Sequence, residues 1–348
     1  MSTDDSGPRY ARPIVPANAV AADGGICPRC RGTVDGTYLA PSRCARCGAV
    51  FQVGTAKLRP RPRDEVSQDT VSVRAGFEDA SAEELIRTRV SSAHLPPDVA
   101  DVHLWYELLG NERGAERAEQ ILGFAGPSVD RSGIALDIGC GMGGSTRSMA
   151  ERFGRIVGID VSFAHLIVAR RRCREASLDN VALICATAEA LPFADGTFEL
   201  INATDVVEHV PQQSAFLLEG YRVLAAGGCF CFNSPNRYNI FGPEPHVNLW
   251  GVGFMPRRWM PAYVRWFKGM GYAGKRLLSY LELRLLLGRT RGMQYRIHGT
   301  AIRRSSARRG WKHRLAFRWP WLVAVANRAL KPFVPQYEVV VSKARSLP

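Results

Sequence analysis

A glycine-rich stretch that reads LDIGCGMGG carries the first pattern that could do chemistry. Gly139, Gly141 and Gly144 fit G-x-G-x-x-G, a spacing that lets the backbone approach a cofactor closely. NAD binding would also need an acidic residue about 20 positions further on, and Asp160 meets that condition. Asp137 separates the candidates, because its charge beside the loop would repel a pyrophosphate and attract an ammonium group. The pattern therefore favours S-adenosylmethionine (SAM), which has an ammonium and a sulfonium group, over NAD.

A second chemical pattern is the stretch DVVEHV. If it is helical, the i, i+3 and i+4 spacing brings Asp205, Glu208 and His209 onto one turn. His209 could then act as a general base near neutral pH. The three residues could instead hold magnesium, because carboxylates suit that ion. They could also simply form a pocket wall and cap a helix, so three interpretations stay open.

Four cysteines form two C-x2-C pairs separated by 13 residues, Cys27 with Cys30 and Cys44 with Cys47. Each pair places two thiolates on one side of a tight turn, and two pairs complete a tetrahedral zinc site. Since four protein ligands close the coordination shell, we expect a structural rather than a catalytic zinc. Between the pairs, a DG dipeptide predicts a hairpin turn. A module this small would depend on its metal for about 10 kcal/mol of stability.

Composition places the chain among cytoplasmic globular proteins. Apolar residues make up 46% and charged residues 22%, which supports a packed core. The N-terminus has acids where a signal peptide is basic, and no run approaches the roughly 18 apolar residues of a membrane span. In that compartment the dispersed cysteines are expected to be small core residues: Cys140, Cys173, Cys185, Cys229 and Cys231.

Changes in composition divide the chain into four parts. Residues 1–22 are expected to be disordered, and residues 23–56 form the zinc-ribbon-like module. Residues 57–77 are a linker rich in proline and charge. The rest, residues 78–348, forms one large domain.

The large domain must position the glycine loop and the DVVEHV stretch. Apolar residues at three- and four-residue spacing predict helices over 78–94 and 101–124. Short apolar runs then alternate with helical stretches, which predicts an α/β fold with a parallel sheet covered by helices on both faces. Ligands bind at the carboxyl ends of the strands in such sheets, and the glycine loop follows the first strand. The predicted strands are 134–138, 155–160, 181–186, 198–203 and 228–233.

Five motifs in this order carry a resemblance to a known family: LDIGCGMGG, VGIDVS, ATAEALPFADGTFELI, DVVEHVPQ and RVLAAGGCFCFNSPNR. With them, residues 120–240 closely resemble class I SAM-dependent methyltransferases of the ubiquinone-biosynthesis O-methyltransferase type. The resemblance implies a Rossmann-like sheet of seven strands, the last of them antiparallel. RGMQYRIHG and YEVVVSKAR match the sixth and seventh strands, with a helix over 320–331 between them.

The resemblance also implies roles for single residues. Asp160 would take both ribose hydroxyls, and residues 187–189 would border the adenine. Family members often have Asp where this chain has Thr187, which shifts adenine recognition toward the backbone. In the ubiquinone enzymes a similar E-x-x-E-H cluster is a metal site, and Asp205 replaces its first Glu here. The implied cofactor residues are Asp137, Gly139, Cys140, Gly141, Asp160, Val161, Thr187, Ala188, Glu189 and Asp205.

An insertion over about residues 236–276 is dense in Trp, Phe, Tyr, Met and Pro, which predicts an apolar pocket or lid over a substrate. Tyr238, Glu244 and Trp250 are its candidate substrate contacts. His246 is a second candidate base, beside His209. Several of the tryptophans are expected only to pack the lid against the core.

A basic region extends from residue 257 to residue 318. It holds 17 Lys and Arg against a single acid, Glu282, in a chain whose net charge is +14. Aromatic residues lie between the charges. An anionic membrane surface would attract both kinds of side chain, and RNA would attract the charges and offer bases for stacking. A plain Arg-rich surface is the third interpretation.

Together these patterns predict a SAM-dependent methyltransferase whose acceptor is a hydroxyl oxygen of a small-molecule, lipid-linked or glycan intermediate. RNA is the alternative acceptor, because the cysteine module resembles zinc modules at the front of some methyltransferases, including ribosomal RNA guanine methyltransferases. A non-catalytic SAM-binding module is a further alternative.

Overall fold

The computed structural model describes nine stretches of the chain. The expected disordered N-terminus (1–22), the linker (57–77) and most of the expected helix over 320–331 lie outside them. The described residues are 25–26, 33–35, 42–44, 50–51, 79–93, 95–127, 129–290, 293–299 and 330–344.

The N-terminal module contains a four-stranded antiparallel sheet in the order β1-β2-β3-β4. Its strands are β1 (Gly25–Ile26), β2 (Thr33–Asp35), β3 (Ser42–Cys44) and β4 (Val50–Phe51). The expected hairpin is present as β2 and β3, but Asp35 pairs with Arg43 and so belongs to β2 rather than to the turn. The zinc prediction stays untested, because Cys27, Cys30 and Cys47 and the side chain of Cys44 are outside the described residues.

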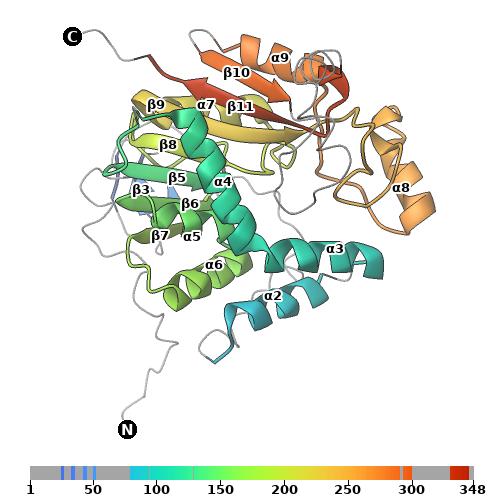
Figure 1. Ribbon diagram of the computed structural model, residues 1–348, viewed down its shortest axis with the longest axis horizontal. Helices are drawn as coiled ribbons and strands as arrows, with labels where there is room; N and C mark the ends of the chain where they lie inside the picture. The colour runs from blue at the N-terminus through green and yellow to red at the C-terminus, as the bar shows by residue number, and fades with distance from the viewer. Residues whose placement is uncertain are drawn as a thin grey trace, which may run out of the picture.

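The large domain is built on a seven-stranded sheet in the order β10-β11-β9-β8-β5-β6-β7 (Figure 1). Neighbours from β9 through β8, β5 and β6 to β7 are parallel. β11 is antiparallel to both β9 and β10, which confirms the predicted antiparallel last strand. The strands are β5 (Ile134–Ile138), β6 (Arg155–Asp160), β7 (Val181–Cys185), β8 (Phe198–Ala203), β9 (Leu224–Pro235), β10 (Gln294–Gly299) and β11 (Gln336–Ser342).

Helices cover both faces of this sheet, as predicted (Figure 1). Alternate strand residues point to opposite faces, and on β9 Phe230 and Phe232 join one apolar cluster while Cys229 and Cys231 join another. The first cluster includes residues of α7 and α9, and the second includes residues of α4 and α5. The helices are α2 (Ala82–Ser91), α3 (Pro97–Leu108), α4 (Gly110–Ala125), α5 (Gly144–Ala150), α6 (Phe163–Glu175), α7 (Gln213–Val223), α8 (Met260–Lys268) and α9 (Tyr280–Gly288), with 3-10 turns η1 (Val252–Phe254) and η2 (Lys331–Phe333).

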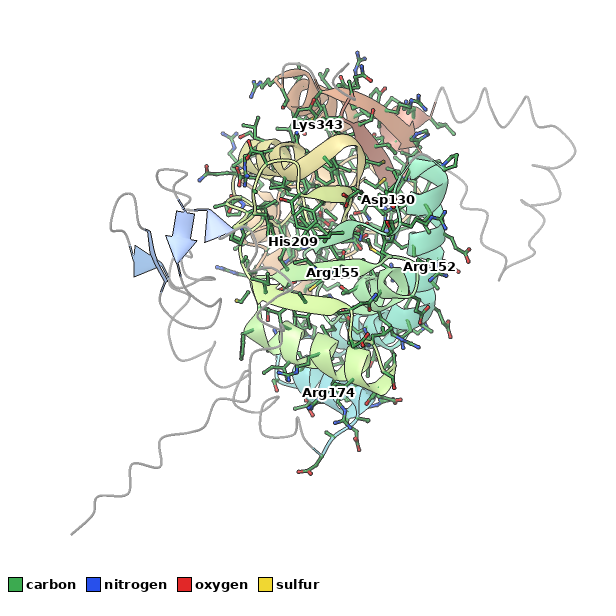
Figure 2. The ribbon with its side chains drawn as sticks, turned by 90° about the vertical axis from the view of Figure 1, so that its left-hand side faces the viewer. Asp130, Arg152, Arg155, Arg174, His209 and Lys343 are labelled. Atoms are coloured by element: carbon green, nitrogen blue, oxygen red, sulfur yellow. The ribbon has the colours of Figure 1, made fainter. Side chains whose placement is uncertain are left out.

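The insertion over 236–276 follows β9 and has a small core of its own. Val247, Val252, Met260, Val264 and Tyr272 pack together there. Figure 1 shows α8 and α3 at the right, beyond the carboxyl ends of the parallel strands. Figure 2 views the molecule from the opposite edge, where β6 begins. The insertion therefore lies on the side of the sheet where a ligand is expected.

Within the described part of the chain, no helix has both the length and the apolar character that crossing a bilayer requires. Of the dispersed cysteines expected in the core, four are buried and Cys185 is partly exposed.

Candidate active site

The glycine loop connects β5 to α5 and adopts the left-handed conformation at several positions. Gly139 and Gly141 have φ angles of +65° and +52°, which favour glycine. A Cβ on Gly139 would come within 2.4 Å of Val206 Cγ2, so the loop lies directly against the segment that follows β8. A Cβ on Gly141 would meet no atom within 4 Å. The open side of the loop therefore has room for a ligand at Gly141.

The third glycine of the motif has a different role from the first two. A Cβ on Gly144 would lie 2.3 Å from the carbonyl oxygen of Gly110, and one on Gly114 would lie 2.2 Å from that of Gly144. Gly144 therefore permits close packing of α5 on α4. Gly143, which the G-x-G-x-x-G pattern skips, has a φ of +86° and supplies the left-handed N-cap of α5.

Asp160 ends β6 and faces the glycine loop. Its Oδ2 accepts a 3.0 Å hydrogen bond from the Gly141 amide, and its Oδ1 accepts a 2.7 Å bond from the Ser162 amide. Burial raises the pKa of Asp160, but hydrogen bonds from His165, Ser162 and Gly141 outweigh it and leave the pKa below its ordinary value. An ionised carboxylate at this position can accept hydrogen bonds from ribose hydroxyls.

Asp137 is buried beneath the loop, with 1% of its surface exposed. Thr146 donates a 2.6 Å hydrogen bond to its Oδ2, and Asn202 donates a 2.8 Å bond to its Oδ1. Burial raises the pKa of Asp137 to about 6, although these two bonds and the charge of Arg117 act in the opposite direction. The carboxylate thus has partners inside the protein and retains acceptor capacity for a cationic ligand.

The remaining predicted cofactor residues surround the same edge of the sheet. Cys140 is buried, and its amide donates to the Ile159 carbonyl at 2.9 Å. Val161, by contrast, is 48% exposed just after β6. In the turn after β7, Ala188 is buried and the Glu189 amide donates to Thr187 Oγ1 at 3.4 Å.

Asp205 is held by residues that the spacing of DVVEHV did not reveal. Asn233 Nδ2 donates to its Oδ1 at 2.6 Å, the Asp205 amide donates to Asn233 Oδ1 at 2.5 Å, and the Tyr106 hydroxyl donates to Oδ2. Asp205 also has a φ of +56°, which an α-helix does not allow. Residues 207–209 form an isolated turn rather than part of a helix, and α7 begins only at Gln213. Asp205 is therefore directed to Tyr106 and Asn233.

Glu208 and His209 instead meet His246, which comes from the insertion. The Nε2 atoms of His209 and His246 are 3.1 Å apart. Oε1 of Glu208 lies 3.8 Å from His246 Nε2 and 4.0 Å from His209 Nε2. The structure thus replaces the expected group of Asp205, Glu208 and His209 by a group of Glu208, His209 and His246. Figure 2 labels His209.

Burial controls the charge of this cluster. Glu208 is 1% exposed, and burial together with the charges of Asp205 and Glu244 raises its pKa well above the ordinary value. Partial burial, with the charges of His246 and Lys275, lowers the pKa of His209 to about 4. His209 is therefore neutral at pH 7 and has a nitrogen lone pair available.

Glu244 orients His246. Its Oε1 lies 2.5 Å from His246 Nδ1, and its Oε2 accepts hydrogen bonds from the amides of His246 and Val247 at 3.0 and 3.1 Å. Of the other predicted substrate residues, Tyr238 packs against Phe254, with ring centroids 5.5 Å apart and ring planes tilted by 41°. Trp250 is 58% exposed. Direct substrate contact by Tyr238, Glu244 and Trp250 stays a prediction.

Two contacts fix the insertion to the cluster. The Arg276 amide donates to the Glu208 carbonyl at 2.7 Å. Gln213 Nε2 donates to the carbonyls of Val207 and Arg276 at 2.8 and 2.9 Å. The turn after β8 and the end of the insertion are therefore held together by one backbone hydrogen bond and by the Gln213 side chain, which bonds to both segments.

Sequence patterns missed several residues of the site. Asn202 could have been found, because a polar side chain inside the apolar run FELINA must have a hydrogen-bond partner when buried. Thr146, Tyr106 and Asn233 carry no comparable signal in one sequence. Their roles appear only when distant segments meet.

Comparison with known proteins supports a methyltransferase core. Residues 136–232 match a family model described as "Methyltransferase domain". The demethylmenaquinone methyltransferase of Listeria welshimeri is 36% identical over 131 residues, 37% of this chain and 56% of that protein. The chloroplastic tocopherol O-methyltransferase of Arabidopsis thaliana is 36% identical over 139 residues, 38% of this chain and 40% of that protein. The chain thus spans about half the length of these curated relatives.

Among solved structures, phosphoethanolamine N-methyltransferase 2 of Haemonchus contortus in complex with SAM aligns with a TM-score of 0.45 and 17% identity. The alignment covers 66% of this chain and 53% of that one. The matched residues 136–232 extend from β5 into β9 and include the glycine loop, Asp160 and Glu208. Residues 136–232 therefore match a methyltransferase domain, and the seven-stranded sheet that contains them has the Rossmann-like methyltransferase fold.

Proposed function

We propose that the protein transfers a methyl group from SAM to a hydroxyl oxygen of a small-molecule, lipid-linked or glycan acceptor. One observation carries this proposal: Gly139 of the cofactor loop lies directly against Val206. In the sequence, Val206 follows Asp205 and precedes the Glu208–His209 pair. The cofactor loop and the cluster of Glu208, His209 and His246 are thereby neighbours. A cofactor held at the loop would present its methyl group beside a cluster suited to activating an acceptor.

The relatives support a small-molecule acceptor. Demethylmenaquinone and tocopherol methyltransferases are named for small molecules, and the two relatives are 36% identical to this chain over 131 and 139 residues. The insertion has a small apolar core of its own at the same edge of the sheet. An acceptor of moderate size could be shielded from water there.

SAM supplies an electrophilic methyl group. The residues of the chain must align the acceptor, exclude water and activate the acceptor hydroxyl. In-line displacement requires that the acceptor oxygen be aligned with that methyl group and that water be excluded. A hydroxyl must also lose its proton. We propose that Glu208, His209 and His246 activate the hydroxyl, with Glu244 holding His246 in position.

We propose that SAM is bound by the cofactor residues predicted between Asp137 and Glu189. Asp205 would contribute to the same site and is held in place by its contacts to Tyr106 and Asn233. Structural zinc at the four cysteines is supported by their spacing as two C-x2-C pairs 13 residues apart. Magnesium does not fit the DVVEHV turn. Asp205 is bound to Asn233 and Tyr106, and the group formed has one carboxylate and two imidazoles.

As a partner, we propose an anionic membrane surface in preference to RNA. Residues 245–281 contain six Lys and Arg and no Asp or Glu. α8 in this segment exposes Trp266 and Phe267 by 85% and 58%. Large exposed apolar side chains beside cations suit a lipid interface.

Methyl transfer from labelled SAM to two fractions of the host cell, a lipid and small-molecule extract and total RNA, tests the proposal. Label in the extract is expected with wild type and not with Asp160→Ala. Label in RNA would favour the alternative acceptor. SAM binding without transfer to either fraction would favour a non-catalytic module.

A further inference from the structure

The cluster of Glu208, His209 and His246 has the composition of a metal site, and its third member, His246, is a ligand that the spacing of DVVEHV did not predict. We propose that these three residues bind one divalent transition-metal ion of the zinc type. One potential ligand atom from each residue lies within 4.8 Å of the other two. The set joins the turn after β8 to the insertion, so it forms only when the two segments meet.

The first support is the unpaired carboxylate of Glu208. Both of its oxygens are buried, and neither has a hydrogen-bond partner in the described part of the chain. A buried polar group without a partner is rare and destabilising. The nearest nitrogen atoms of His246 and His209, at 3.8 and 4.0 Å, are too far for hydrogen bonds but suitable for sharing an ion.

The second support is the distance between the imidazoles. Two nitrogen ligands at about 2.0 to 2.1 Å from a tetrahedral zinc ion lie about 3.3 Å apart. The observed separation of 3.1 Å between the Nε2 atoms of His209 and His246 is close to that value. The Glu208 oxygen would have to approach by a few tenths of an ångström.

The third support is the orientation of His246 by Glu244. The contact of 2.5 Å between Glu244 Oε1 and His246 Nδ1 favours the tautomer with hydrogen on Nδ1. The Nε2 lone pair then points to Glu208 and His209. A carboxylate behind a ligating histidine is the usual outer partner of such a ligand. Two backbone amides hold the other oxygen of Glu244, which fixes the whole arrangement.

Ligand type identifies the class of metal. Two imidazoles and one carboxylate suit zinc and neighbouring transition metals, whereas magnesium prefers oxygen ligands. Three protein ligands also leave a coordination position open. Under the proposed function, on which this step alone rests, the acceptor hydroxyl would occupy that position and lose its proton to water more readily. His209 would then be a ligand rather than the free base that its sequence position suggested.

Metal binding can be measured without any methyl acceptor. The full-length protein is treated with a chelator, dialysed and titrated with Co²⁺, with visible absorption and bound metal per chain as the readouts. We expect wild type to bind one equivalent more than His246→Ala and Glu208→Gln. The four N-terminal cysteines contribute equally to all variants, so the difference reports only this cluster. Retained SAM binding shows that each variant is folded, and His246→Gln replaces any variant that is not.

Two control variants sharpen the result. His103→Ala removes a histidine near His246 that is not in the set, and Asp205→Asn removes the acid of the expected magnesium group. Both should keep the extra equivalent. Equal stoichiometry in wild type and His246→Ala would overturn the proposal, as would loss in Asp205→Asn alone. Methyl transfer is assayed separately, so a methyltransferase without this metal, or a metal site without transfer, is recognisable.

Discussion

The amide of Gly141 donates a 3.0 Å hydrogen bond to Asp160, so the acid that ends β6 holds the glycine loop that follows β5. Ser162 occupies the other carboxylate oxygen at 2.7 Å. The same side chain that is expected to bind the ribose therefore also shapes the loop expected to bind the methionine end. The two halves of the cofactor site are coupled through one residue.

Asp160→Ala should abolish most SAM binding, because it removes both the ribose ligand and the brace on Gly141. Loss of hydrogen bonds to a charged group predicts a decrease in affinity of about 10- to 100-fold. Isothermal titration calorimetry with SAM measures this. Asp179→Ala, which removes an exposed acid, should bind normally. Binding of NADH to the wild type would contradict the cofactor assignment.

SAM affinity should depend on pH through Asp137. Because burial raises the pKa of this carboxyl to about 6, it is largely protonated at pH 5 and ionised at pH 7. Its attraction for an ammonium group should therefore increase across this interval. Calorimetry from pH 5 to 7 should show affinity rising with a midpoint near 6, and Asp137→Asn should bind more weakly and without this rise. His165→Gln, which removes the imidazole beside Asp160, should retain the increase in SAM affinity between pH 5 and 7.

The same pKa affects stability with the opposite sign. Asp137 has a folded-state pKa of about 6, above its ordinary 3.8, so the folded state holds this proton more tightly than the unfolded state. Its contribution to the free energy of unfolding is present below about pH 4 and is lost as the pH rises through 6. Urea titrations should show a smaller decline over this interval in Asp137→Asn than in wild type. An equal decline of the unfolding free energy in both proteins would show that groups other than Asp137 control its pH dependence.

The sheet was predictable from the sequence because its signals are local. All seven strands were placed by short apolar runs or by the family resemblance, and the glycine loop was correctly placed after the first of them. The helical stretch over 101–124, however, is two helices that meet at Leu109. Apolar spacing does not reveal this break, because the mean helical period continues across it.

The cluster was only half predictable for a physical reason. Helical spacing placed Asp205 with Glu208 and His209, but Asp205 adopts φ +56° and is held by Asn233 and Tyr106. The partner that does meet Glu208 and His209 is His246, 37 residues beyond His209. A contact between segments so far apart depends on how the insertion folds back, which local patterns do not encode.

Gly144→Ala should strongly destabilise the domain. The new Cβ would lie 2.3 Å from the Gly110 carbonyl oxygen, so α5 and α4 would have to separate. Overpacking of this kind costs about 1 to 3 kcal/mol. Urea unfolding measures the change. Gly123→Ala is the matched control, because it lies in α4 with nothing within 4 Å of the new Cβ and should stabilise by about 0.5 to 1 kcal/mol. Equal effects of the two substitutions would disprove the contact.

The surface of α8 should bind anionic vesicles. Trp266 and Phe267 are exposed, and Arg258 and Arg265 are exposed beside them. Co-sedimentation with vesicles of phosphatidylglycerol and phosphatidylcholine should exceed that with phosphatidylcholine alone and should weaken with salt. Arg265→Gln should lower the affinity about fivefold, since one cation contributes about 1 kcal/mol near such a surface. Trp266→Ala should lower it further by removing apolar contact.

Trp105→Ala controls for loss of an exposed tryptophan as such, because Trp105 is 61% exposed on α3, outside the basic segment. It should leave vesicle binding unchanged. Charge alone would not distinguish lipid from RNA, since Arg265→Gln weakens binding to either. The aromatic variant does: a lipid interface requires Trp266 to enter apolar surroundings, whereas double-stranded RNA offers mainly phosphates and hydroxyls. The surface would be assigned to nucleic acid if Trp266→Ala left both the retention on double-stranded RNA and the binding to vesicles unchanged.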